Sequence, residues 1–108
     1  MTAPSWFRFG FDEHGVHRQA RPPGQAPWSD SVAWADIERV CLEMADLFEP
    51  DTLYIFSRLR PESCVFPLES EAGQELLHEL IRRQLFDAKL AIEAASGEGL
   101  FCWPKKEG

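Results

Sequence analysis

The sequence has no apolar stretch that continues for more than a few residues before a charged side chain interrupts it. A membrane-spanning helix needs about 20 consecutive, mostly apolar residues. The first residues, MTAPSWFRFG, also lack the basic and apolar regions of a secretory signal. We therefore expect a cytoplasmic protein with no membrane partner.

Cysteine is scarce: the chain has Cys41, Cys64 and Cys102, and no C-x-x-C pair. An odd number of cysteines cannot be paired completely into disulfides. Because free cysteine packs as a small apolar residue, we expect buried, reduced thiols.

Basic residues are in the minority, with 11 lysines and arginines against 18 aspartates and glutamates and a net charge of −7. The charge sums to about zero over residues 1–30, to −3 over 31–60 and to −4 over 61–108. Such a field repels phosphate backbones and anionic lipids. We expect no nucleic acid partner, and a preference for a basic protein partner.

Sequence motifs of common enzymes are also missing, since there is no G-x-G-x-x-G, no P-loop and no G-x-S-x-G elbow. The carboxylates are scattered, and none pairs evidently with a second one in a cleft. We therefore expect no catalytic residue, no cofactor and no enzymatic activity. An enzyme would require a fold that brings distant residues into one pocket.

What the chain does have is the composition of a globular domain, with 44% apolar and 27% charged residues. Its 108 residues are enough for one core and too few for two domains. We expect a single domain over residues 1–108, with a frayed tail at 105–108.

The beginning of the chain predicts a β-hairpin. Phe7, Phe9 and Phe11 alternate with other residues, which is the period of a strand with a buried aromatic face. A second alternating run begins at Val16, and the residues between the two runs, 12–15, end in glycine, as hairpin loops often do.

This loop lies in the stretch FGFDEHGVHR, where side chains that could bind a metal or take part in catalysis are denser than anywhere else in the chain. Asp12, His14 and His17 have the side chains of a metal site. However, ligands at a hairpin tip lack the surrounding groups that orient imidazoles, and the two histidines are not at the helical i, i+4 spacing. We expect architecture rather than a metal site.

Residues 21–30, RPPGQAPWSD, are predicted to form a Pro/Gly loop. The loop carries Trp28, an aromatic residue that would either contact a partner or fold back over the core.

Residues 31–48 fit two structures. Apolar residues recur at three and four positions from Trp34 to Phe48, as in an amphipathic helix, but shorter runs alternate as in two strands offset at Ala35–Asp36. Periodicity alone leaves both open.

The following segments have clearer patterns. Residues 51–60 and 64–68 alternate as strands joined by a turn at Pro61, with Pro67 indicating an edge strand. A helix begins after Ser70, and a second helical stretch begins near Asp87, either as a separate helix or as a bent continuation. It ends at Ser96–Gly97, where we expect a left-handed glycine, and residues 100–104 predict a last strand.

The stretches VAWADIERV and DLFEPDTLYIF resemble a group of small uncharacterised bacterial proteins and bacterial pleckstrin-homology-like domains. The resemblance covers residues 32–85. It implies that 32–34 and 37–44 are strands, which we adopt, and an α+β fold in which an antiparallel sheet or partial barrel of about five to six strands is closed by one or two C-terminal helices. The basic loop that binds phosphoinositides in such domains is absent, because the corresponding turn is Asp12–His14. What remains implied is a scaffold for protein contacts.

Three functions follow from these patterns. The first is a small interaction module, of the immunity or toxin-neutralising type, that binds a basic protein. The second is a ligand-binding or enzymatic domain with a pocket between sheet and helix, formed by Tyr54, Arg58 and His78. The third is a homodimer that pairs strand edges or buries Trp28 and Trp103. For the first, the predicted contacts are Trp28 and an acidic band of Asp36, Glu38, Glu43, Asp46, Glu49 and Asp51.

Overall fold

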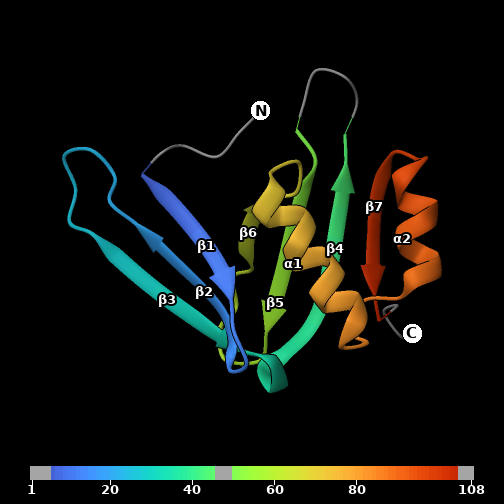
Figure 1. Cartoon of the computed structure of the whole chain (residues 1–108), viewed down its shortest axis with the longest axis horizontal. Helices are drawn as coiled ribbons and strands as arrows, with labels where there is room; N and C mark the ends of the chain where they lie inside the picture. Colours follow the sequence, from blue (N-terminus) through green and yellow to red (C-terminus); the bar gives the residue numbers. More distant parts are fainter. Residues whose placement is uncertain (1–5, 46–49, 105–108) are drawn as a thin grey trace.

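The computed structural model describes residues 6–45 and 50–104. Over these ranges the chain forms seven strands and two α-helices, with the strands arranged in two antiparallel sheets (Figure 1). The α+β class is as predicted, but there are more strands than predicted and the sheets do not close into a barrel. The elements are β1 (Phe7–Phe11), β2 (Gly15–Ala20), β3 (Trp28–Ala33), η1 (Trp34–Asp36), β4 (Ile37–Met44), β5 (Thr52–Ser57), β6 (Cys64–Pro67), α1 (Glu71–Arg82), α2 (Ala88–Ala95) and β7 (Gly99–Trp103).

The first sheet has the order β1-β2-β3 and contains the predicted hairpin. Asp12 shapes its turn, because its Oδ1 accepts hydrogen bonds from the backbone N–H groups of His14 (2.8 Å) and Gly15 (3.2 Å). A Cβ at Gly15 would lie 2.1 Å from the carbonyl oxygen of Val32, so the close approach of β3 requires glycine here.

Two expectations for this sheet need correction. The Pro/Gly loop ends earlier than residue 30, because β3 begins at Trp28 and pairs along its whole length with β2. The aromatic face of β1 is only partly buried: Phe9 packs against the core, but Phe11 is 37% exposed. Phe11 is the last residue of β1, and its ring contacts the partly buried Trp34 with centroids 6.0 Å apart rather than entering the core.

The second sheet has the order β6-β5-β4-β7. The strand interpretation of residues 37–44 is confirmed, whereas Trp34 lies in the short helix η1 rather than in a strand. The register between β4 and β5 shifts between Ile37 and Arg39. This irregularity breaks the alternation of apolar residues, which explains why the segment also fits a helix.

The core lies between the second sheet on one side and α1 with the first sheet on the other. Figure 1 shows α1 lying across β4 and β5, while the two sheets diverge from the end that holds η1. Phe9 and Phe66 join the sheets, with ring centroids 5.1 Å apart. The buried core residues are Val16, Val32, Val40, Leu42, Leu53, Ile55, Cys64, Phe66, Leu68, Leu76, Leu80, Phe86 and Ala94.

The C-terminal helical region is two helices, which decides a question that the sequence leaves open. Ser70 Oγ caps α1 by accepting from the N–H of Gly73, and Asp87 Oδ2 caps α2 by accepting from the N–H of Leu90. Gln84 between them has a φ of 63°, which ends the first helix. The left-handed glycine near the end of α2 is Gly99 and not the predicted Gly97. In the part of the chain that the structure describes, no helix has the length and apolarity needed to cross a membrane.

The cysteines are not all reduced thiols, so this expectation is wrong. Cys41 in β4 and Cys102 in β7 form a disulfide, because the pairing of these strands places the two residues directly opposite each other. Cys64 is a free, buried thiol whose pKa is raised, chiefly by burial. The predicted frayed tail, 105–108, lies outside the described residues.

Gly73 gives a direct test of the packing of α1. A Cβ there would lie 2.2 Å from the carbonyl oxygen of Pro67, so we expect Gly73→Ala to lower the free energy of unfolding by about 1–3 kcal/mol. The loss is expected although alanine favours helix over glycine by about 1 kcal/mol. Urea denaturation measures it. Gly10→Ala is the control, because a Cβ at Gly10 meets nothing within 4 Å, and equal losses in both variants would contradict this packing.

Candidate functional site

The outward side of the first sheet is polar and hollowed. Residues alternate along its strands, so Val16 and Val32 face the core while the outward side carries mainly Arg8, His17, Gln19, Ser29 and Ser31. Two adjoining hollows, of about 550 and 410 Å³, share Arg8, Gln19 and Ser29 in their walls. We call this surface the outer trough, and define it by Trp6, Arg8, Gly10, His17, Gln19, Arg21, Trp28, Ser29 and Ser31.

The larger hollow lies where β1 and β3 begin and β2 ends. Trp6 and Trp28 line it and are 39% and 41% exposed, which is high for tryptophan. Arg8 and Arg21 line it too, and neither forms an ion pair with another residue of the described ranges. Two guanidinium groups without an ion pair in the described ranges and the exposed Trp6 therefore line one concave surface. Trp28 lies at its rim, because the register with Ala20 places its side chain on the core side of β3, beside Phe7 and Arg18.

Trp28 is held from the core side by an ion network. Asp30 accepts hydrogen bonds from Arg18 Nε at 2.8 Å and from Arg60 Nη1 at 2.8 Å. The guanidinium of Arg18 lies 5.1 Å from the centroid of the Trp28 ring, within the range of a cation–π contact. The hydrogen bond from Arg18 is the largest cause that lowers the pKa of Asp30. This network orients Trp28 and compensates the charge of Asp30.

A hydroxyl and an imidazole that line the smaller hollow lie in a row with a carboxylate beside it. Ser31 Oγ is 2.6 Å from His17 Nδ1, and His17 Nε2 is 2.9 Å from Asp12 Oδ2. The contact with His17 is the largest cause that lowers the pKa of Asp12 to about 2, followed by the backbone N–H of His14. His14 itself is directed to Glu13, with Nε2 3.5 Å from Oε1.

The metal alternative for Asp12, His14 and His17 therefore has no support from the geometry. Within residues 6–45 and 50–104, no group of three or more histidine, cysteine, aspartate or glutamate side chains is arranged to hold a metal ion. Sequence reasoning noticed Asp12 and His17 but missed Ser31, which the strand register places opposite His17.

The acidic band is divided between the two ends of β4. Asp36 lies before the strand, with its Oδ1 3.3 Å from Arg58 Nε, and Asp51 lies beyond it, accepting from the backbone N–H of Ala45 at 2.9 Å. Eight strand residues separate these ends by about 25 Å. The band also includes two exposed residues, Glu38 and Glu43, and two that lie outside the described residues, Asp46 and Glu49.

The pocket residues Tyr54, Arg58 and His78 do not converge. Tyr54 lies on the side of the second sheet that faces away from α1, and its hydroxyl donates to Glu43 Oε1 at 2.7 Å, which raises the pKa of Tyr54. Arg58 extends to the carbonyl oxygen of Ala35, and His78 is exposed on α1. None of the three lines either hollow of the outer trough.

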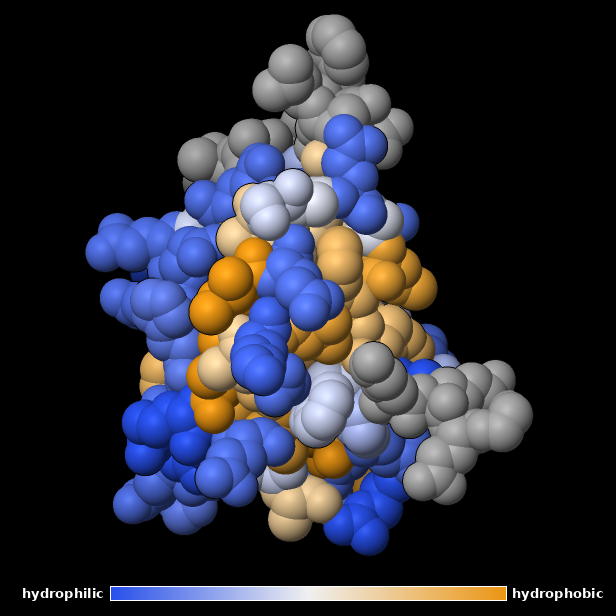
Figure 2. Space-filling model, turned by 90° about the vertical axis from the view of Figure 1, so that its right-hand side faces the viewer, coloured by the Kyte–Doolittle hydropathy of each residue, from blue (hydrophilic) through white to orange (hydrophobic). Residues whose placement is uncertain are grey.

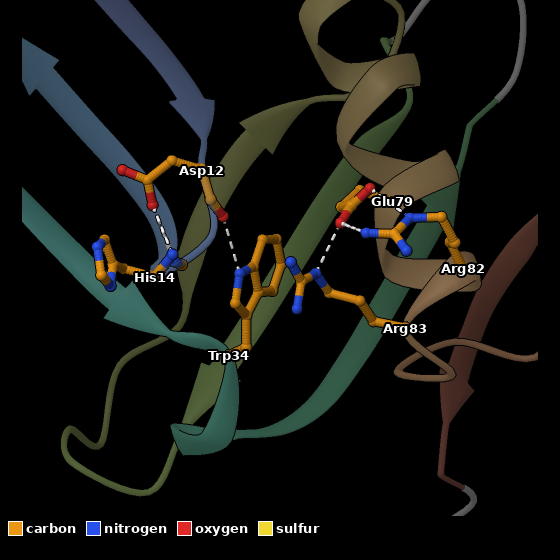
Figure 3. A network of polar contacts seen from close by, with 7 residues as sticks. Asp12, His14, Trp34, Glu79, Arg82 and Arg83 are labelled. Carbon is orange, nitrogen blue, oxygen red and sulfur yellow. Dashed lines mark hydrogen bonds and ion pairs between the residues drawn. The ribbon is translucent and has the colours of Figure 1, made fainter.

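A second polar cluster connects the hairpin to α1 (Figure 3). Trp34 Nε1 donates to the carbonyl oxygen of Asp12 at 2.9 Å, and the guanidinium of Arg83 lies 4.2 Å from the centroid of the Trp34 ring. Arg82 and Arg83 both donate to Glu79 and hold its pKa at about 2, with Arg82 as the larger cause. All of these groups are paired with one another, so the cluster is structural.

Apolar side chains gather at the opposite end of the molecule, over α2 and β7 (Figure 2). Ile92 and Leu100 are 72% and 64% exposed there, whereas Trp103 packs partly buried against the core. β7 is an edge of the second sheet. Trp28 and Trp103 therefore lie on different sheets, and the two do not form one surface.

The comparisons with known proteins add no assignment to these surfaces. The resemblance of residues 32–85 to pleckstrin-homology-like domains stays a prediction from the sequence. No known family model, no curated protein and no solved structure matches this chain.

Proposed function

We propose that the chain is a small protein-interaction module that binds an acidic segment of a partner in the outer trough. The observation that supports this most directly is that Trp6, Arg8 and Arg21 line the hollow of about 550 Å³, with Trp28 at its rim. Six strands, two helices and a last strand form two antiparallel sheets, and we propose that this α+β fold serves as the scaffold for such contacts.

Composition is the first argument for a protein partner. Tryptophan and arginine are the residues most enriched among those that dominate the binding energy of protein interfaces. They combine a large apolar area with a fixed geometry of hydrogen-bond donors. In this chain they lie on a concave surface, where a partner side chain can be removed from water on several sides.

Charge is the second argument, and it selects an acidic partner segment. The protein carries −7 overall, yet among the described residues no carboxylate lines the larger hollow of the outer trough, and Arg8 and Arg21 leave it locally positive. An acidic segment would be attracted to this surface and repelled elsewhere, which restricts where it docks. This revises the expectation of a basic partner, whose proposed contacts are divided between the ends of β4.

We do not extend the proposal to a cytoplasmic location. The Cys41–Cys102 disulfide is of a kind that persists in oxidising compartments and is rare in the reducing cytosol of mesophiles. A location outside the cytosol would also determine which partner proteins the chain encounters.

The test compares two charge reversals of equal size. Arg21→Glu changes the outer trough, and Lys89→Glu is the matched control, because Lys89 is an exposed residue of α2 with no ion pair to the described residues. Partners captured from an extract of the native cell are identified by mass spectrometry, and their affinities are then measured by calorimetry with purified components. We expect an acidic partner whose affinity falls at least about tenfold with Arg21→Glu, falls with added salt, and is nearly unchanged by Lys89→Glu.

Two other results would contradict the proposal. A basic partner that is lost on Glu38→Lys or Glu43→Lys, and not on Arg21→Glu, would favour the toxin-neutralising hypothesis. If the captured partner were a second copy of the chain, and Leu100→Asp abolished its binding, the result would favour a homodimer through the edge of β7.

A further inference from the structure

The geometry points to Ser31 as a nucleophile, activated by His17 and Asp12, that attacks a small carboxylic ester. This inference concerns the smaller hollow of the outer trough and goes beyond the proposed protein contact. It requires no partner, so it stands or fails independently of the proposed function.

The order of the groups is that of an acyl-transfer site: hydroxyl, imidazole, carboxylate. Ser31 Oγ lies 2.6 Å from Nδ1 of His17, and Asp12 Oδ2 lies 2.9 Å from Nε2 on the other side of the same ring. Nε2 is shielded from solvent, and its contact with Asp12 is short but not well aligned as a hydrogen bond. Such contacts commonly improve in alignment when a substrate binds.

The carboxylate is held in place before any substrate arrives. Asp12 Oδ1 accepts from the N–H groups of His14 and Gly15, which leaves Oδ2 for His17. A carboxylate at Nε2 favours the ring tautomer that has its proton on Nε2. Nδ1 then has a free lone pair directed at the Ser31 hydroxyl, as a general base requires.

The structure also provides space for a substrate beside the hydroxyl. Ser31 and His17 line the hollow of about 410 Å³, and Gly10, opposite His17 in the sheet, has no neighbouring atom within 4 Å of the position of a Cβ. Arg8 lines the same hollow and is unpaired in the described ranges. Its charge favours an ester with an anionic group and would stabilise a developing oxyanion.

The reaction uses only water as a second reactant. Ser31 Oγ forms a bond to the ester carbonyl carbon while its proton moves to Nδ1 of His17, and the alcohol leaves with that proton as the C–O ester bond breaks. Water then attacks the acyl group, His17 takes its proton and returns it to Ser31 Oγ, and the carboxylic acid is released. Asp12 stays ionised and stabilises the imidazolium formed in each half of the reaction.

Ser29 provides an internal control, because it lies on the same side of the same strand two residues away and lines both hollows. The purified protein is treated with a fluorophosphonate probe, which loses fluoride as it bonds to an activated serine, and the modified residue is identified by peptide mass spectrometry. We expect modification of Ser31 and not of Ser29. Ser31→Ala is expected to abolish it. Ser96→Ala, which changes an exposed serine at the end of α2 that lines neither hollow, is expected to leave it unchanged.

The contribution of the base is measured on the modification rate. His17→Gln is expected to lower the rate at least about 100-fold and to remove its decline in acid, because general-base assistance is worth about 10² to 10⁴. Asp12→Asn, a change in a positioning residue, is expected to lower it less and keep the pH dependence. Circular dichroism tests whether each variant is folded. If His17→Gln does not fold, Ser31→Ala still tests the inference. Equal modification of both serines, no modification of Ser31, or an unchanged rate in folded His17→Gln would overturn the inference.

Discussion

Replacing Phe66 by alanine is expected to lower the free energy of unfolding by about 3–5 kcal/mol, the loss typical of a fully buried phenylalanine. Phe66 is 1% exposed, and its ring contacts Phe9 of the other sheet at a centroid distance of 5.1 Å. It also lies 5.8 Å from the guanidinium of Arg18. The variant loses the contact that joins the two sheets as well as the buried area of one side chain.

Urea denaturation followed by tryptophan fluorescence measures this loss. Val65→Ala is the control, because Val65 is the neighbouring residue on the opposite side of β6 and is 46% exposed. We expect it to change stability by less than about 1 kcal/mol. If the two variants were equally stable, Phe66 would not lie in the core and the packing of the sheets would be wrong.

Removing the Cys41–Cys102 disulfide is expected to lower the free energy of unfolding by about 4 kcal/mol. The bond joins residues 61 positions apart, and the entropy of the unfolded chain that such a loop removes corresponds to about that value in the loop-closure model. Reduction also frees β7 from covalent attachment to β4, although their backbone pairing remains.

The measurement compares urea denaturation with and without dithiothreitol. The double variant Cys41→Ala, Cys102→Ala should have the stability of the reduced wild type and should not respond to the reductant. Intact mass after alkylation counts the free thiols, and we expect one, Cys64, before reduction. Three alkylated thiols in protein purified without reductant would show that the bond does not form.

Local patterns were sufficient to predict much of the fold. The hairpin follows from alternating residues on both sides of Asp12–Gly15, and the two helix starts follow from Ser70 and Asp87, whose side chains are the caps. These features depend on residues that are neighbours in the sequence. β4 was harder to predict, because the register shift after Ile37 adds a residue to the strand. The spacing of its apolar residues then resembles that of an amphipathic helix.

The pairs of the candidate site and the disulfide could not be predicted, because each depends on a strand register. Ser31 meets His17 only because β3 begins at Trp28, and the assignment of residues 21–30 to a loop concealed the alternation of WSDSVA. The pairing of Cys41 with Cys102 requires that the last strand crosses back to β4. Arg8 and Arg21 are ordinary surface residues in the sequence, and only the structure brings them beside the two tryptophans.

The strand order β6-β5-β4-β7 has a consequence for synthesis on the ribosome. β4 gains its partner on one side as soon as β5 emerges, but its other side has no partner until residues Gly99–Trp103 have left the exit tunnel. An exposed strand of this kind is a template for pairing with other chains. The nascent protein should therefore be most vulnerable to aggregation, and most dependent on chaperones, over the interval in which α1 and α2 emerge from the exit tunnel.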